Sequence, residues 1–262
     1  MQDLQGIRDA YEHDGYVVVR DVLDAELVGE ARAHIDWLLA KHPNIRPEQL
    51  GHTLVHDDPF WVRLVSDDRL LDVAEQFIGP NIALFASHYI AKRPFDGQAV
   101  LWHQDGSYWP LDPMDVITMW LAIDDSVPEN GCMQVIPGSH SLDLQQMQAR
   151  TDVDNVLNSG IDMSMVDEQQ AVDVVLKAGD VSLHHPNILH GSNANTSPLW
   201  RRGLTIRYIP TSTRITLPSW ECAFALRGAT VPGINDYLPW PGYIEGRDMP
   251  FHDSAAWNTR LH

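Results

Sequence analysis

Apolar positions recur every three to four residues in two stretches of the first 80 residues, which is typical of amphipathic helices. In the stretch 23–43 the residues that share one helical face are Leu27, Ala31, Ile35, Leu38 and Leu39. Asp24 precedes this face as a candidate N-cap. The stretch 67–80 repeats the pattern and ends in Gly-Pro, a common helix stop. With a short strand expected at 16–20, residues 1–80 are predicted to be mostly helical.

From residue 81 onward the pattern changes to short runs rich in β-forming residues. These runs lie at 81–93, 115–124, 132–137, 171–176, 180–185 and 201–210. Turn-forming segments separate them, such as FDGQ at 95–98 and KAGD at 177–180. Many short strands with this punctuation predict a barrel or a jelly roll of two sheets. The segment 141–170 is polar and aperiodic, and we expect an excursion from the sheets there.

Alternation within two of these runs predicts which side chains face inward, because strand side chains point to opposite faces in turn. In the run 116–123 one face is wholly apolar and consists of Ile117, Met119, Leu121 and Ile123. Its other face carries Thr118 and Trp120. In the run 201–209, Arg201, Thr205 and Arg207 share a face opposite Leu204, Ile206 and Tyr208. We expect the apolar faces to pack on the N-terminal helices and the polar faces to line a cavity, where a buried arginine needs an anion.

Length and composition are those of one ordinary globular domain covering residues 1–262, with helical support at 1–80, a β core at 81–210 and a tail at 211–262. The formal net charge of −18 argues against nucleic acid and anionic membranes as partners. Two cysteines do not make a disulfide framework. The N-terminal stretch has no signal-peptide pattern, and no apolar run is long enough to span a membrane. These features predict a soluble cytoplasmic protein; they say nothing of its oligomeric state.

The run VLWHQDGSYWP at 100–110 places a histidine and an aspartate two residues apart among aromatic residues. In an extended chain His103 and Asp105 lie on the same side, so they can provide two ligands to one metal ion. Histidines at 184, 185 and 190 are candidates for a third ligand. Two imidazoles and one carboxylate form the facial triad of non-haem iron(II) oxygenases. Of the three, His190 is followed by Gly-Ser and, eleven positions later, by Arg201.

At these residues the sequence resembles the phytanoyl-CoA dioxygenase family of iron(II)- and 2-oxoglutarate-dependent oxygenases. The resemblance is carried by WHQDGSYW (102–109), NGCMQVIPGSH (130–140) and HGSNANTSPLWRR (190–202), and residues 15–28 also resemble the family's opening. It implies a mainly β fold with flanking helices around a double-stranded β-helix core, a cupin-like variant of the jelly roll. It also implies iron(II), 2-oxoglutarate and O₂ as the reaction's cofactor and co-substrates.

The resemblance assigns roles to particular residues. His103, Asp105 and His190 match the iron ligands, and Arg201 matches the arginine that holds the far carboxylate of 2-oxoglutarate, although Arg202 is a rival. Further expected contacts of 2-oxoglutarate are Ser192, Trp120, Thr118 and Tyr89. His184 and His185 are interpreted as packing residues or as neighbours of the ligands.

The predicted reaction is hydroxylation of a small organic metabolite, with succinate and CO₂ as co-products. Asp105 favours hydroxylation over halogenation, because halogenases of this superfamily have a small residue at that position. Desaturation, epimerisation and cyclisation stay open, as do a non-catalytic binding module and a cupin-like enzyme that does not use 2-oxoglutarate. The aromatic residues of the tail suggest that part of 215–250, with part of 141–170, covers the iron; the alternative is that the tail packs on the outside of the barrel.

Overall fold

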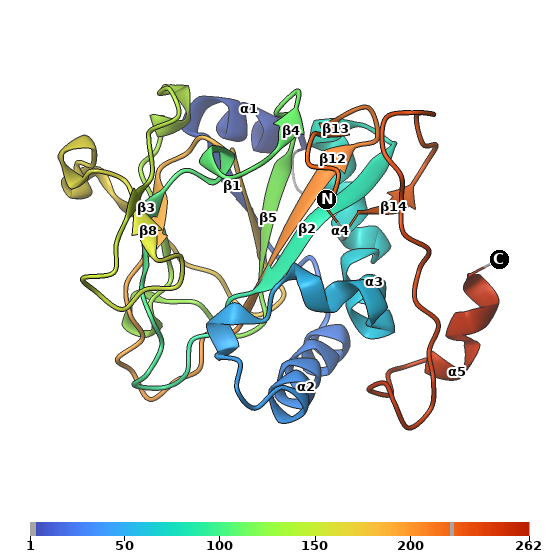
Figure 1. The fold of residues 1–262 in the computed structure, drawn as a ribbon. Helices are drawn as coiled ribbons and strands as arrows, with labels where there is room; N and C mark the ends of the chain where they lie inside the picture. The colour runs from blue at the N-terminus through green and yellow to red at the C-terminus, as the bar shows by residue number, and fades with distance from the viewer. Residues whose placement is uncertain (1–3, 221–222, 262) are drawn as a thin grey trace.

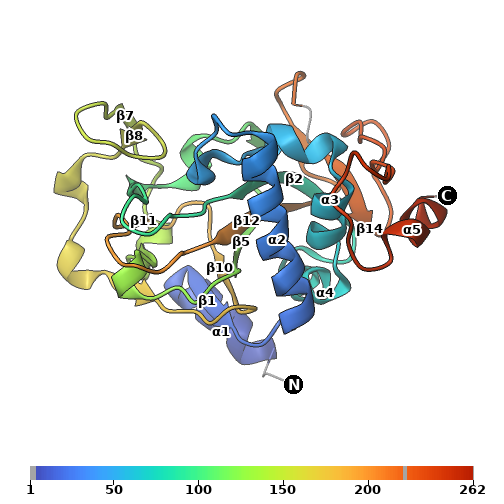
Figure 2. The same ribbon diagram turned by 90° about the horizontal axis from the view of Figure 1, so that it is seen from below.

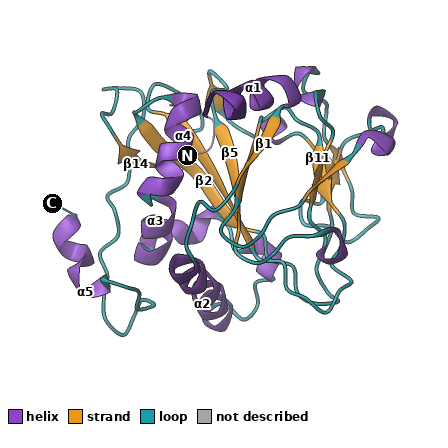
Figure 3. Cartoon of the chain, turned by 180° about the vertical axis from the view of Figure 1, so that it is seen from behind, coloured by secondary structure: helices purple, strands orange, loops and turns teal. Residues whose placement is uncertain are grey.

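Two β-sheets face each other, and the long helices cover the outer face of the larger one. The computed structural model describes residues 4–220 and 223–261. In the described chain the larger sheet has the strand order β1–β10–β5–β12–β2–β14, and the smaller has the order β3–β11–β6–β9. Figure 3 shows the two sheets as separate layers, with α3 and α4 on the side of the larger sheet that faces away from the smaller.

The strands are short and pair antiparallel throughout. Those of the larger sheet are β1 (Tyr16–Val19), β2 (Ile82–Tyr89), β5 (Ile117–Ala122), β10 (Val181–His184), β12 (Gly203–Pro210) and β14 (Phe224–Arg227). Those of the smaller sheet are β3 (Val100–His103), β6 (Met133–Val135), β9 (Val172–Val174) and β11 (His190–Ser192). Two-residue strands form two further pairs, β4 (Leu111–Asp112) with β13 (Arg214–Ile215) and β7 (Gln148–Ala149) with β8 (Ser159–Gly160). The two-sheet core predicted from the turn-punctuated runs is confirmed.

The helices begin and end where local chemistry favours it. They are α1 (Leu4–Asp14), α2 (Ala25–Lys41), α3 (Pro59–Val65), α4 (Asp68–Ile78) and a short α5 (Ser254–Trp257). The Asp24 carboxylate accepts a hydrogen bond from the Leu27 amide at 2.9 Å, which confirms the predicted N-cap of α2. Gly79 ends α4 with a positive φ of 80°, a conformation that glycine adopts without strain. Figure 2 shows α2 lying along the larger sheet.

The main core lies between these helices and the outer face of the larger sheet. Met119, Leu121, Leu204 and Ile206 from the sheet are fully buried in one cluster with Leu27, Ala31 and Ile35 from α2. Each such aliphatic side chain contributes about 1.5–3 kcal/mol on burial. The predicted alternation is therefore confirmed, and its second consequence follows: the other face of β5 and β12 turns toward the smaller sheet.

The tail after β14 runs over the helices. The Phe251 ring lies 5.8 Å from the Phe60 ring of α3, and Trp240 and Trp257 stack at 5.8 Å. Figure 1 shows the tail and α5 on the far side of the molecule from β3 and β8. No described helix is long and apolar enough to cross a bilayer.

Candidate metal centre

Three predicted ligands converge at the edge where β3 and β11 pair. His103 is the last residue of β3, and β-pairing places His190 of β11 directly opposite it. Gln104 is extended, so the Asp105 carboxylate, at the start of a 3₁₀ turn, returns to the side of His103. The ligand atoms of His103, Asp105 and His190 all lie within 4.8 Å of one another, and all three residues are buried. The separation of the His103 Nε2 and Asp105 Oδ1 atoms is 3.6 Å.

Hydrogen bonds to the backbone set the tautomer of both histidines. His103 Nδ1 lies 2.8 Å from the Leu101 carbonyl, and His190 Nδ1 lies 3.1 Å from the Ile188 carbonyl. Because a carbonyl oxygen only accepts, each Nδ1 must carry the proton and donate it. Each Nε2 therefore keeps a free lone pair, which is the form in which imidazole binds a metal. Burial holds the pKa of His190 well below its ordinary value, so its ring is neutral at neutral pH.

The Asp105 carboxylate is ionised although it is completely enclosed. Burial alone would raise its pKa, but the positive charge of Arg207, together with the close approach of His103 and His184, holds the pKa well below the ordinary value. The Thr118 hydroxyl also approaches Asp105 Oδ2, at 3.5 Å. A buried, charged carboxylate beside two imidazoles whose Nδ1 atoms are held by backbone carbonyls is a suitable ligand set for a divalent cation.

The two other candidate histidines have different surroundings. His184 Nε2 lies 3.5 Å from Asp105 Oδ2, and the His184 ring lies 4.6 Å from the His190 ring, so His184 borders the site. His185 points elsewhere: its Nδ1 accepts from the Asn187 amide, and its ring neighbours Tyr11 and His140. Neither His184 nor His185 therefore belongs to the group of potential metal ligands. The interpretation of His184 as a neighbour of the ligands agrees with its position.

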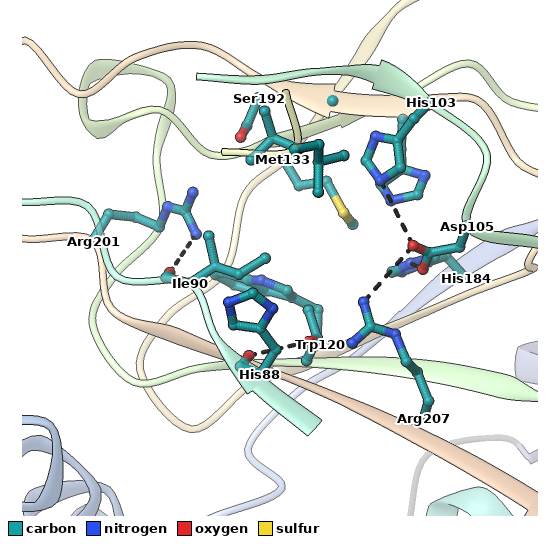
Figure 4. A pocket seen from close by; sticks show the side chains of 15 residues that line it. His88, Ile90, His103, Asp105, Trp120, Met133, His184, Ser192, Arg201 and Arg207 are labelled. Atoms are coloured by element: carbon teal, nitrogen blue, oxygen red, sulfur yellow. Dashed lines mark hydrogen bonds and ion pairs between the residues drawn. The ribbon is translucent and has the colours of Figure 1, made fainter. Parts of the chain in front are cut away.

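A cavity of about 70 Å³ adjoins the three ligands and extends between the two sheets. Its lining includes His88, Ile90, Trp120, Ser192, Arg201 and Arg207 (Figure 4). The lining also includes Leu157, from the segment 141–170, but no described residue of 211–262. Of the two segments expected to cover the site, the first contributes a side chain and the tail does not.

Arg201 brings a positive charge to one side of this cavity. It is fully enclosed, and its guanidinium lies over the Trp120 ring at 5.3 Å from the centroid. Its Nη1 donates to the Ile90 carbonyl at 3.1 Å, while its buried Nε has no hydrogen-bond partner among the described residues. Burial lowers the pKa of Arg201 to about 10, which leaves it charged at neutral pH. The rival Arg202 points to the opposite face, where its Nε donates to Asp124 at 2.7 Å.

Lys92 is a buried amine near Arg201 that the sequence reasoning missed. Its Nζ donates to Ser192 Oγ at 2.7 Å and to the Asn193 carbonyl. Burial, reinforced by the charge of Arg201, holds the pKa of Lys92 well below its ordinary value. The sequence does contain a signal for Lys92. His88, Ile90 and Lys92 are spaced two residues apart, so an extended chain places all three on one face.

Tyr89 and Thr118, two of the expected contacts of 2-oxoglutarate, do not line the cavity. Tyr89 is wholly buried on the helix side of β2, where its hydroxyl hydrogen bonds to His34 Nδ1 at 2.9 Å, so the expectation that it reaches the cavity is corrected. Its neighbour His88 lines the cavity instead, because adjacent strand residues face opposite ways. Thr118 lies behind Asp105 and is not among the lining residues.

The family model described as Phytanoyl-CoA dioxygenase (PhyH) matches residues 11–203. This chain belongs to the phytanoyl-CoA dioxygenase family. Phytanoyl-CoA dioxygenase 1 of Oryza sativa subsp. japonica is 28% identical over 176 residues, covering 67% of this chain and 62% of the rice protein. The chain thus spans less than two thirds of that relative. Ectoine dioxygenase of Sphingopyxis alaskensis is 27% identical over 235 residues, covering 80% of this chain and 76% of the relative.

Solved structures agree with this phytanoyl-CoA dioxygenase fold. A non-haem monooxygenase, ThoJ, superposes with a TM-score of 0.76 at 22% identity, covering 99% of this chain and 94% of the other. The iron-bound structure of EctD from S. alaskensis gives a TM-score of 0.65 at 25% identity, with 86% of each chain covered. The family and the jelly-roll core expected from the sequence are confirmed, and the expected enzyme class agrees with relatives that are named dioxygenases.

Proposed function

We propose that this chain hydroxylates a small organic metabolite, with His103, Asp105 and His190 as its iron ligands. The observation that carries the proposal is the pairing of two features in one cavity. One is a buried group of two imidazoles and an ionised carboxylate; the other is a buried guanidinium, Arg201, that forms no ion pair with a carboxylate among the described residues. The donor set fits iron(II), because it leaves positions open for a chelating co-substrate.

Bound iron supplies activation of O₂ coupled to the conversion of 2-oxoglutarate into succinate and CO₂. The protein's own contribution is to bind and orient. Arg201 provides a planar pair of donors for the far carboxylate of 2-oxoglutarate, and Ser192 and Lys92 lie beside it. Trp120 closes the same end of the cavity and keeps water from it.

The cavity favours a small substrate. Its volume of about 70 Å³ suits a small molecule, and Leu157 of the segment 141–170 forms part of its lining. The net charge of −18 gives no support for a coenzyme A thioester, whose phosphates favour basic surfaces. Relatives are named for compounds as different as phytanoyl-CoA and ectoine, so family membership does not select the substrate.

Succinate formation tests this proposal. The purified protein, with iron(II), ascorbate and 2-oxoglutarate, should release succinate faster when the correct member of a panel of small metabolites is added. An anaerobic titration should also show a visible absorbance change when iron(II) and 2-oxoglutarate bind together. Metal-dependent substrate turnover without succinate would favour a cupin-like enzyme, and the absence of both signals would reject the proposed function.

A further inference from the structure

Arg207 brings a second guanidinium into the cavity, well apart from Arg201. It lies on β12 six residues after Arg201 and on the same face of the strand. Figure 4 shows the two side chains approaching the cavity from different sides, with Arg207 on the side of Asp105. The contact between Arg201 and 2-oxoglutarate leaves this second positive group unexplained.

Arg207 uses few of its five hydrogen-bond donors. Nη1 donates to Thr205 Oγ1 at 3.0 Å, and the guanidinium lies over the Trp109 ring at 5.2 Å. Nη2 lies 3.7 Å from Asp105 Oδ1, which is too long for a hydrogen bond. The buried Nε has no partner among the described residues. A largely buried guanidinium with unused donors is unfavourable unless an anion completes its hydrogen bonds.

Arginines that serve the fold of this protein are paired differently. Arg202 reaches Asp124 at 2.7 Å, and Arg227 reaches both Asp68 and Asp72 at 2.7 Å. These are charge-assisted hydrogen bonds of ordinary length. The long contact of Arg207 with Asp105 sets it apart from them and leaves its head available to a ligand.

The balance of charge in the cavity also favours an anionic ligand at Arg207. Asp105 is the one carboxylate among the lining residues, whereas Arg201 and Arg207 are both cationic. A divalent metal ion adds two positive charges, and 2-oxoglutarate supplies two negative ones. One positive charge is then left without a counterpart on the side of Arg207.

We propose that Arg207 binds a carboxylate group of the primary substrate. This inference rests on the proposed function and narrows its substrate class to small carboxylic acids. Because Arg207 adjoins the metal ligand Asp105, the acid group is held close to the metal. The carbon that is hydroxylated therefore lies within a few bonds of the carboxylate.

The test measures binding separately from turnover. The protein is loaded with Mn²⁺ and saturated with 2-oxoglutarate, so that Arg201 is occupied. Proton relaxation of three acids by the bound Mn²⁺ is then compared with that of their uncharged amides: acetate with acetamide, propionate with propionamide, and benzoate with benzamide. We expect at least one acid to bind about tenfold or more tightly than its amide, since the amide lacks the charge that the guanidinium pairs with.

Substitutions assign that preference to Arg207. Arg207→Gln should weaken binding of the preferred acid about 10- to 100-fold, as expected for a lost hydrogen bond between charged groups, and Arg207→Lys should restore part of it. Arg202→Gln removes the same charge from the opposite face of the strand and is the matched control; it should leave acid binding unchanged.

Two results would overturn the inference. One is that none of the three acids binds better than its amide to a protein that binds Mn²⁺ and 2-oxoglutarate normally. The other is that Arg207→Gln weakens Mn²⁺ binding but leaves the acid preference intact, which would make Arg207 a positioning residue for Asp105. A wild-type protein that binds neither Mn²⁺ nor 2-oxoglutarate would instead reject the proposed function.

Discussion

Asp105 has a larger effect on its surroundings than either histidine, because it is the negative group among the cavity-lining residues. Its oxygens lie 3.5–3.7 Å from His103, His184 and Arg207. Removing it leaves these groups facing one another without an anion. The loss is therefore electrostatic as well as a missing ligand.

We predict that Asp105→Ala lowers the affinity for Mn²⁺ or iron(II) by at least about 100-fold, since even changes to groups that support a ligand cost 10- to 100-fold. Electron paramagnetic resonance titration of Mn²⁺ measures the affinity, and succinate release reports the activity. A variant that retained iron and hydroxylated at the wild-type rate would show that His103, Asp105 and His190 are not the working ligand set.

The neighbouring arginines 201 and 202 give a sharp comparison. Arg201→Ala should raise the KM for 2-oxoglutarate about 10- to 100-fold with metal affinity nearly unchanged, because it removes a charge-assisted contact. Arg202→Ala should leave that KM near the wild-type value, because its guanidinium pairs with Asp124 on the other face. Steady-state kinetics with 2-oxoglutarate as the varied substrate measure both KM values. A raised KM in Arg202→Ala but not in Arg201→Ala would show that Arg202 holds the co-substrate.

At the scale of elements, alternation along strands was the most informative property of the sequence. It placed Arg201, Thr205 and Arg207 in the cavity and Leu204, Ile206 and Tyr208 in the core, and the structure has them there. The same rule, applied to β2, would have rejected Tyr89 and selected His88. The sequence of β2 does not decide this by itself, because apolar residues dominate both of its faces and polarity then does not show which face is inside.

Gly203 connects strand packing to the cavity. A Cβ atom at this position would lie 2.2 Å from Trp120 Cζ2, so any larger residue forces the indole to move. We predict that Gly203→Ala weakens 2-oxoglutarate binding about tenfold, because Trp120 packs against Arg201, and lowers the free energy of unfolding by about 1–3 kcal/mol.

Gly29→Ala is the matched control, since nothing lies within 4 Å of its added Cβ. In the middle of α2 this change should be neutral or stabilise by up to about 1 kcal/mol. Calorimetric titration of 2-oxoglutarate and urea denaturation measure both variants. Unchanged 2-oxoglutarate binding in Gly203→Ala would show that the position of Trp120 does not affect binding of the co-substrate.

At the scale of the whole molecule, the tail was the part that the sequence left undetermined. Between its short elements β13, β14 and α5, the described part of 211–262 forms little regular structure, and many of its aromatic side chains pack singly against other parts of the fold. The buried Trp257, for example, donates its indole N–H to the Pro241 carbonyl at 2.8 Å and stacks on Trp240. Such contacts depend on where the helices lie, which local sequence does not encode.

The position of the tail predicts a role in stability. Trp257→Ala should lower the free energy of unfolding by about 3–5 kcal/mol, the usual cost of deleting a buried tryptophan, while metal and 2-oxoglutarate affinities stay at wild-type values. Urea denaturation and Mn²⁺ titration measure the two effects.

Truncation after residue 214 extends the test, because it removes β14 together with the aromatics that cover α3. We expect an unstable or insoluble fragment. A folded fragment that binds iron and 2-oxoglutarate but releases succinate without hydroxylated product would instead show that the tail covers the active site.

The two cavity arginines, Arg201 just before β12 and Arg207 within it, also limit how this sequence can change. An extended chain advances about 3.3 Å per residue and turns each side chain to the opposite face, so the strand fixes both the spacing and the sidedness of Arg201 and Arg207. A single insertion or deletion between them would leave one arginine in the cavity and turn the other into the apolar helix interface. In a library of length variants we therefore expect the stretch 202–206 to tolerate substitutions but no change in length, whereas loops such as 141–170 can lengthen or shorten as the enzyme adapts to new substrates.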